Sequence, residues 1–149
     1  MTNFETVIKT TEQLTPSELI NLLKERTKVF VVEQNCPYQE VDDKDISAIH
    51  VFFKNKNQIL AYARIVPFNQ EYMSIGRVLV VKEYRQLKLG RKLFATAMDE
   101  VTKRFPKKRV KIQAQSYLEA FYASFGFKAV SDSYLEDGIP HLDMILQNK

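Results

Sequence analysis

Hydrophobic residues recur most regularly in the second half of the chain, where an apolar residue occupies every fourth position from Leu89 to Phe105. This spacing is typical of an amphipathic helix with one apolar face. It predicts a helix from about Leu87 to Arg104 that ends before Pro106, because proline cannot continue a helix.

Two shorter helices are predicted from their first residues. The segment 15–18, Thr-Pro-Ser-Glu, combines a capping threonine, a proline suited to the first helical position and a glutamate that completes a capping box. The β-branched run 29–32 leaves the end of this helix undefined. A second capping box at 116–119 predicts a helix that runs through Ser124 and is ended by Gly126.

The remaining apolar runs are short, rich in β-branched and aromatic residues, and bounded by polar turns. They predict strands at residues 4–9, 48–54, 58–66, 72–82, 110–114, 127–133 and 141–146. Residues 55–57 and 136–140 are expected to form turns, and the acidic segment 35–45 a loop. Three successive strands between helices indicate an α+β fold rather than a regularly alternating α/β pattern.

Composition narrows the class of protein. A length of 149 residues fits one domain, and a hydrophobic share of 45% is enough for a core. The N-terminal residues lack a signal-peptide pattern, and no apolar run reaches the ~18 residues that span a membrane. The single cysteine, Cys36, excludes an internal disulfide and supplies no metal cluster. We therefore expect a cytoplasmic protein with no metal and no membrane partner.

The charge is unevenly distributed. Residues 82–111 hold eleven lysines and arginines but three acids, a net charge of +8, which leaves −4 for the rest of the chain. Such a stretch fits a surface for nucleic acid or a phosphorylated cofactor, and equally a solvated helix face. Nucleic acid is the weaker interpretation, because the basic residues follow a strongly apolar helix and lack interleaved aromatic residues.

The sharpest local feature is the junction between the strand 78–81 and the long helix. A helix N-terminus presents free backbone N–H groups and a partial positive charge, so it suits a phosphate. Gly90 would let a ligand approach the backbone closely, and Arg85 and Lys88 could add charge-assisted contacts. A plain strand-to-helix connection is the alternative.

This junction and the order of elements resemble the GNAT family of N-acetyltransferases, whose signature is [Gln/Arg]-x-x-Gly-x-[Gly/Ala]. Arg85 matches the first position and Gly90 the last, whereas Lys88 replaces the middle glycine. The resemblance implies a single domain over residues 1–149, with a mixed, mostly antiparallel central sheet flanked by helices. It also implies that acetyl-CoA (coenzyme A) binds at Val78, Leu79, Val80, Arg85, Gln86, Leu87, Lys88, Leu89, Gly90, Arg91 and Tyr122.

A second mark of the family is the Phe-Tyr-x-x-x-Gly-Phe pattern at 121–127. Its tyrosine, Tyr122, commonly stands near the cofactor sulfur in this family, although a tyrosine on an amphipathic helix is by itself more often a core residue. Residues 26–45 with His50, and residues 75–78 and 134–141, look like the ElaA-like branch. The resemblance covers nearly the whole chain.

The implied reaction is direct transfer of an acetyl group from acetyl-CoA to an amine of a small molecule or protein, by a monomer or homodimer. A backbone N–H near Val80 would bind the thioester carbonyl, and Tyr122 would protonate the thiolate.

For the catalytic base, Glu33 and His141 are favoured among Glu33, Glu40, Asp42, Glu136, His50 and His141. The acceptor is expected to contact Arg26, Gln34, His50, Arg77 and Glu136. Arg26 and Arg77 could instead pair with the acidic loop.

Other functions stay open at this point. Cys36 could carry the acetyl group as a covalent intermediate, although free cysteines are usually buried as small hydrophobes. Replacement of the middle glycine by Lys88 allows a non-catalytic acyl-CoA-binding or interaction domain. Residues 26–30 faintly resemble acyl-homoserine lactone synthases, which allows transfer to an alcohol or of a longer acyl chain.

Overall fold

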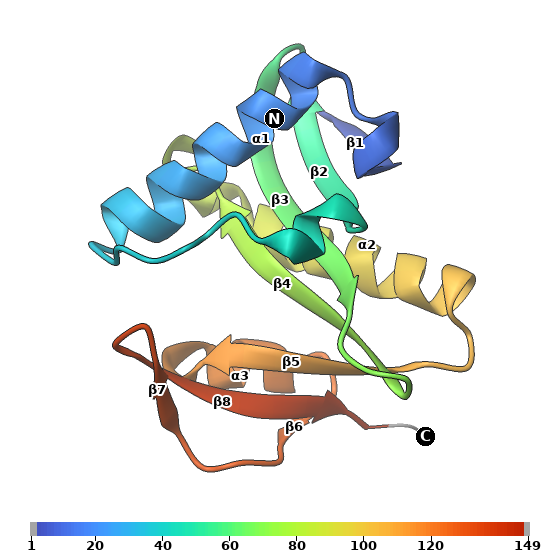
Figure 1. Cartoon of the computed structure of the whole chain (residues 1–149), viewed down its shortest axis with the longest axis vertical. Coiled ribbons are helices and arrows are strands. Elements are labelled where there is room, and N and C mark those ends of the chain that lie inside the picture. The colour runs from blue at the N-terminus through green and yellow to red at the C-terminus, as the bar shows by residue number, and fades with distance from the viewer. Residues whose placement is uncertain (1–2, 148–149) are drawn as a thin grey trace.

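The strands form one eight-stranded sheet in the computed structural model, which describes residues 3–147 (Figure 1). Met1 and Thr2, where the signal-peptide expectation begins, lie outside the described residues. The strand order is β1-β2-β3-β4-β5-β8-β6, with β7 also paired to β8. The strands are β1 (Glu5–Thr10), β2 (Ile49–Asn55), β3 (Gln58–Pro67), β4 (Tyr72–Val80), β5 (Arg109–Gln115), β6 (Phe127–Ala129), β7 (Tyr134–Glu136) and β8 (Ile139–Leu146).

Helices cover both faces of this sheet. In Figure 1, α1 (Pro16–Arg26) crosses one face of β2 and β3, and α2 (Leu89–Arg104) and α3 (Glu119–Ala123) lie on the other. Each helix packs an apolar face on the sheet, so β3 is buried on both faces and reads as an almost continuous apolar run. Two apolar cores result, one under α1 and one under α2.

A β-bulge in β4 shapes the middle of the sheet. Tyr62 of β3 pairs with Leu79 and Arg64 pairs with Gly76, so two residues of β4 face one residue of β3. One of those two, Arg77, has a φ of 53°, a left-handed conformation that non-glycine residues rarely adopt. The bulge bends β4 away from its straight course.

β4 and β5 separate soon after they meet. This parallel pair is joined only at Tyr72–Arg109 and Met73–Val110, after which β5 pairs with β8 instead. The gap between β4 and β5 widens toward their C-terminal ends in Figure 1. The backbone edge of β4 beyond Met73 therefore has no strand partner on the β5 side.

Several predicted boundaries need correction. The strand expected at 72–82 ends at Val80, and the 3-10 helix Lys82–Leu87 precedes α2, which begins at Leu89. The strand expected at 127–133 is shorter and ends at Ala129, as β6. The chain then turns and forms a separate strand, β7, which also pairs with β8. The helix that begins at Pro16, whose end the sequence left undefined, ends as α1 at Arg26 and continues as the π-helix Thr27–Glu33.

The predicted capping box at 116–119 does not form. The Ser116 hydroxyl lies 3.1 Å from that of Ser133, a residue seventeen positions away, instead of capping a helix. The segment Ser116–Leu118 is a 3-10 helix, and α3 begins at Glu119. The box at 15–18 does form: the Glu18 N–H donates to Thr15 Oγ1 at 3.1 Å, and the Thr15 N–H donates to Glu18 Oε1 at 2.8 Å.

Candidate active site

The separation of β4 and β5 opens a cavity of about 590 Å³. Its walls come from the π-helix and the segment after it, from β3, β4 and β5, from α3, and from the β7–β8 hairpin. The predicted site residues that line it are Glu33, Gln34, Arg77, Val78, Leu79, Val80, Arg85, Tyr122, Glu136 and His141. Residues far apart in the sequence therefore share one cavity.

The free edge of β4 points into this cavity. The Val81 N–H donates to Leu60 O of β3 at 2.8 Å. Because successive residues of an antiparallel strand direct their hydrogen-bonding groups to opposite sides, the N–H and C=O of Val80 face the open side. The Val80 carbonyl accepts a hydrogen bond from Arg85 Nε at 2.9 Å, and not from a strand.

Tyr122 lies on the opposite side of the same opening. It is buried, and its ring packs edge-on against Phe94 with 5.0 Å between ring centroids. Burial, together with nearby Tyr117, raises the pKa of Tyr122 to about 12. The phenol therefore keeps its proton at neutral pH and is available as a proton donor.

Of the junction 85–90, Arg85 lines the cavity, whereas residues 86–90 and the predicted cosubstrate ligand Arg91 do not. Lys88, in place of the family's middle glycine, has a φ of 59° and a ψ of 27°, the left-handed region that glycine favours. It occupies the N-cap of α2 but makes no capping hydrogen bond with its side chain, so the first N–H groups of the helix lack this partner. Gln86, Leu87 and Leu89 complete the turn.

Two cations flank this junction. Arg91 lies with its guanidinium carbon 4.8 Å from the ring centroid of Phe125 and donates to Ser124 Oγ at 2.9 Å. Arg85 forms an ion pair of 2.7 Å with Glu33 of the π-helix. The expected phosphate ligand Arg85 and the expected base Glu33 thus contact each other, and both line the cavity.

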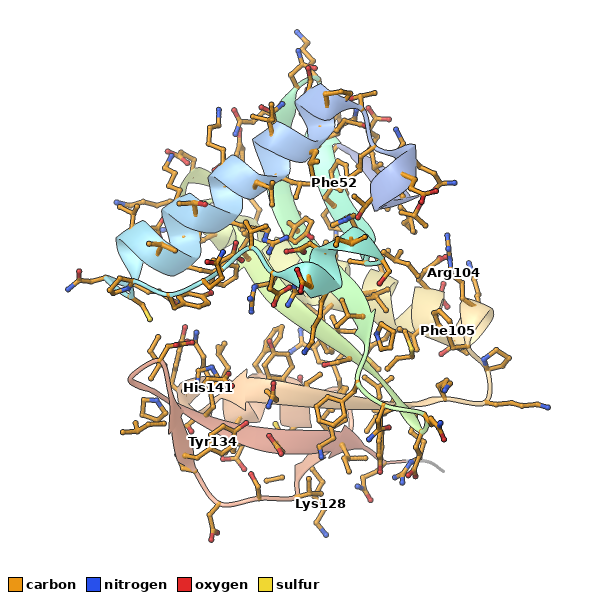
Figure 2. The ribbon with its side chains drawn as sticks, viewed as in Figure 1. Phe52, Arg104, Phe105, Lys128, Tyr134 and His141 are labelled. Atoms are coloured by element: carbon orange, nitrogen blue, oxygen red, sulfur yellow. The ribbon has the colours of Figure 1, made fainter. Side chains whose placement is uncertain are left out.

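His141 enters the cavity from the β7–β8 hairpin. Its Nδ1 lies 2.7 Å from Ile139 O and its Nε2 lies 3.9 Å from Glu136 Oε2. Figure 2 shows His141 beside Tyr134, and the two rings stack with 6.3 Å between centroids. The hairpin thus brings an imidazole and a carboxylate into the same wall.

Comparison with known proteins agrees with this geometry. A family model described as an acetyltransferase (GNAT) domain matches residues 10–148. The chain belongs to this family. It is 42% identical to the protein ElaA of Escherichia coli over 136 residues, which are 89% of each chain. It is also 42% identical to a UPF0039 protein of Schizosaccharomyces pombe over 149 residues, 99% of each chain.

Solved structures show the same fold. The structure of E. coli ElaA aligns with a TM-score of 0.90 at 39% identity, over 96% of this chain and 99% of that one. An acyl-CoA N-acyltransferase from Pseudomonas aeruginosa aligns with a TM-score of 0.91 at 39% identity, over 97% and 100%. The predicted ElaA-like resemblance and the α+β GNAT fold are confirmed, and membership of the family supports acyl-CoA-dependent acyltransferase activity.

Arg26 and His50, which were predicted to contact the acceptor, do not line the cavity of this GNAT domain. The structure corrects that prediction. Arg26 is fully buried, and its guanidinium is held by Glu40 at 2.9 Å and Asp45 at 2.8 Å. His50 is also fully buried, with Nδ1 2.6 Å from the Tyr62 hydroxyl. Both side chains have their partners inside the core and cannot reach an acceptor.

Glu40 and Asp42, weighed as bases from the sequence, do not line the cavity either. Glu40 lies buried between Arg26 and Arg77. Asp42 pairs with Arg64 at 2.8 Å, and its pKa stays below its usual range because this guanidinium stabilises the charged form despite partial burial.

Some cavity residues of this GNAT domain were missed from the sequence. Arg64, Lys44, Tyr38 and Phe68 line the cavity but were not predicted to belong to the site. A signal existed for Arg64, because a charged residue in the middle of the apolar run 58–66 needs a special environment. Tyr38 and Phe68 lie in loops and Lys44 in the short 3-10 helix Asp43–Ile46, and no local pattern distinguishes them.

Contacts across the opening join its walls. The thiol of Cys36 is buried and lies 3.2 Å from Asp137 O of the hairpin. The side-chain amide of Gln115 donates to Gln34 Oε1 at 3.5 Å. The loop after the π-helix therefore touches both the hairpin and β5.

Residues 3–147 contain no group of three or more His, Cys, Asp or Glu side chains placed to bind a metal ion. Within the same residues, none of the helices combines the length and the apolar character needed to cross a bilayer.

Proposed function

We propose that this GNAT domain transfers the acetyl group of acetyl-CoA directly to an amine. The observation that carries the proposal is the separation of β4 and β5, which exposes the Val80 edge and the Tyr122 phenol to one cavity. Hydrogen-bond donors and a proton donor thereby meet where a thioester carbonyl and its sulfur would lie.

The residues present fit the cosubstrate. An extended arm with amide groups can pair with the free edge of β4 as a strand would. The uncapped N-terminus of α2 and the nearby cations suit a pyrophosphate. The cosubstrate-binding residues are Val78, Leu79, Val80, Arg85, Gln86, Leu87, Lys88, Leu89, Gly90, Arg91 and Tyr122.

Bound acetyl-CoA supplies an electrophilic thioester carbonyl. The Val80 N–H stabilises the negative charge that develops on the carbonyl oxygen when the amine adds. Tyr122 gives its proton to the sulfur as the C–S bond breaks, and the new C–N bond remains. Glu33 or His141 takes the proton that the amine loses, and the proton on Tyr122 is then restored from solvent.

Two measurements test this function together. We expect coenzyme A and acetyl-CoA each to raise the melting temperature, because a ligand that binds only the folded state stabilises it. We also expect acetyl-CoA to release free thiol in the presence of an amine from a panel. The proposal would be falsified if neither form shifted the melting temperature at millimolar concentration.

A non-catalytic acyl-CoA-binding domain is the alternative that the sequence leaves open. The backbone at Lys88 already has the conformation that the missing glycine would adopt, so this substitution gives no reason to expect a lost function. Binding without thiol release for every amine would favour the alternative.

A further inference from the structure

Six charged side chains form a connected cluster beneath the cavity. Arg26 contacts Glu40 and Asp45, Arg64 contacts Asp42 and Asp45 at 2.8 and 2.9 Å, and Arg77 lies 2.8 Å from Glu40. Three guanidinium groups thus balance three carboxylates. Burial of so many charges is costly unless each is paired, so the arginines are held firmly in place.

The arginines and the carboxylates of the cluster are placed differently relative to the cavity. Of its six members, Arg64 and Arg77 line the cavity, whereas Arg26 and the three carboxylates do not. The Glu40 side chain is only 3% exposed. Glu40 and Asp45 therefore lie behind the arginines, whereas Asp42, whose side chain is 32% exposed, pairs with Arg64 outside the cavity lining. The cavity itself meets guanidinium groups.

Arg77 keeps donors for a ligand. Its Nη2 donates to Glu40 O at 2.8 Å and lies 3.5 Å from Asp42 Oδ2. Its Nε is close to the Glu40 carboxylate without directing its N–H at it. Its Nη1 makes no hydrogen bond to the described residues 3–147 and belongs to a side chain that is 22% exposed. The guanidinium also lies over the Tyr38 ring, 5.6 Å from its centroid, which fixes its plane.

Lys44 adds an uncompensated charge to the same wall. It is exposed, lines the cavity, and has no ion pair within the described part of the chain. Lys44 directly precedes Asp45 in the sequence, and Asp45 pairs with Arg64. This ion pair fixes the backbone next to Lys44. The charged side chains that line this wall are thus the basic ones, Lys44, Arg64 and Arg77, and carboxylates of the cluster balance the two arginines.

The acidic residues that line the cavity lie away from the β4 bulge. Arg64 pairs with Gly76 near the middle of β4, whereas Glu33 contacts Arg85 beyond the end of this strand. The hairpin that carries Glu136 and Asp137 extends past the C-terminal end of β5, because His141 pairs with Gln115. The charged lining thus changes along the cavity, from basic side chains near the bulge to the acids Glu33, Glu136 and Asp137 beyond the end of β4, where Arg85 balances Glu33.

We propose that the acceptor amine carries a carboxylate that binds to Arg77, Arg64 and Lys44. This inference rests on the proposed function, which puts the reacting amine near Val80, at the acidic end. Arg77 precedes Val80 by three residues of β4, about 10 Å at about 3.3 Å per residue. The carboxylate is therefore separated from the amine by several bonds. A polyamine would bring a second positive charge to the basic wall.

The test compares three amines that differ in one group. L-lysine has a carboxylate, L-lysinamide replaces it with a neutral amide, and 1,5-diaminopentane lacks it. We expect kcat/KM with acetyl-CoA to be at least about 10-fold higher for lysine, because charge-assisted hydrogen bonds to a carboxylate are strong. Arg77→Gln should reduce the lysine-to-lysinamide ratio to about 1, and Lys44→Gln should reduce it by a few fold.

Controls separate this site from folding and from general charge. Arg77→Lys should retain part of the preference, since it keeps the charge. Lys128→Gln should leave the ratio unchanged, because Lys128 is exposed on β6 and lies apart from His141 in Figure 2. If Arg77→Gln does not fold, Lys44→Gln decides, because Lys44 is exposed. Equal kcat/KM for lysine and lysinamide, or a faster reaction of the diamine, would overturn the proposal.

A binding measurement keeps the carboxylate site testable apart from transfer. Lysine and lysinamide are titrated into the protein in the presence of coenzyme A, where no acetyl group is available. Tighter binding of lysine that Arg77→Gln abolishes supports the site, and equal binding refutes it. Absence of thiol release with every amine contradicts the proposed function, and the titration still decides the carboxylate site.

Discussion

The hydroxyl of Tyr122 can be removed with little effect on its surroundings. Its ring packs against Phe94 and Phe127, contacts that phenylalanine would preserve. We expect Tyr122→Phe to bind acetyl-CoA within about 2-fold of the original affinity, while kcat falls about 10²–10⁴-fold through loss of the proton donor. Steady-state thiol release and calorimetric titration measure the two effects. Unchanged turnover would remove Tyr122 from the reaction.

The outcome for single residues shows what sequence can and cannot predict about a site. Val80 and Arg85 lie in one short segment, so their proximity follows from the chain itself. Arg64 and Lys44 line one cavity because the segment after the π-helix folds back onto β3, where Asp45 pairs with Arg64, and no local pattern encodes this. Arg26 was misassigned for the converse reason, since burial of a side chain depends on packing of distant segments.

At the scale of elements, the N-terminus of α2 offers a test that separates ligand binding from folding. A Cβ at Gly90 would meet Val80 Cγ2 at 3.5 Å, an ordinary contact, and Gly90 lies in the helix. We expect Gly90→Glu to leave the free energy of unfolding unchanged or to raise it by up to about 1 kcal/mol, because glutamate has the higher helix propensity and a negative charge suits a helix N-terminus. The affinity for coenzyme A should fall at least about 10-fold, because the carboxylate repels a pyrophosphate at this helix end.

The matched control for this variant is Lys88→Gly, which suits the left-handed backbone at that position. It should keep the affinity for coenzyme A. Thermal unfolding and calorimetric titration of both variants measure the effects. An unchanged affinity in Gly90→Glu would mean that the pyrophosphate does not approach this residue.

Elements whose signals are local were predicted well. The capping box at 15–18 acts within four residues, and the apolar period of α2 describes one face of one helix. The run 29–32 is β-branched yet helical, because Val29 and Phe30 bury against Tyr62 and neighbouring core residues. Tertiary packing overrides intrinsic preference there. The Ser116 cap failed for the same reason, through its contact with Ser133.

At the scale of the whole molecule, His50 couples stability to pH. Burial lowers the pKa of His50 to about 4, from 6.5. Between these values the unfolded chain binds a proton that the folded chain does not, so the free energy of unfolding decreases as pH falls from 6.5 to 4. At about 1.4 kcal/mol per pH unit the loss amounts to roughly 3 kcal/mol.

Urea unfolding at pH 7, 5.5 and 4 measures this loss, and His50→Gln should flatten it. The same pH dependence in the variant and the original protein would contradict the assignment.

Below about pH 4 the free energy of unfolding decreases further, because two carboxylates become protonated. The pKa values of Asp42 and Asp45 are lowered by their arginine partners despite burial, so their contribution is present above about pH 4 and disappears as they protonate.

The gap between β4 and β5 also bears on aggregation. An exposed strand edge is a template on which another chain can add a strand, and proteins usually protect such edges with charges, proline or bulges. Here the unsatisfied edge lies inside the sheet, with β5 on its far side and the Cys36–Asp137 contact joining the walls. A narrow, flexible ligand can pair with this edge, but a folded neighbour cannot insert a strand. The protein thus keeps unused backbone hydrogen bonds for a small partner without offering them to another protein.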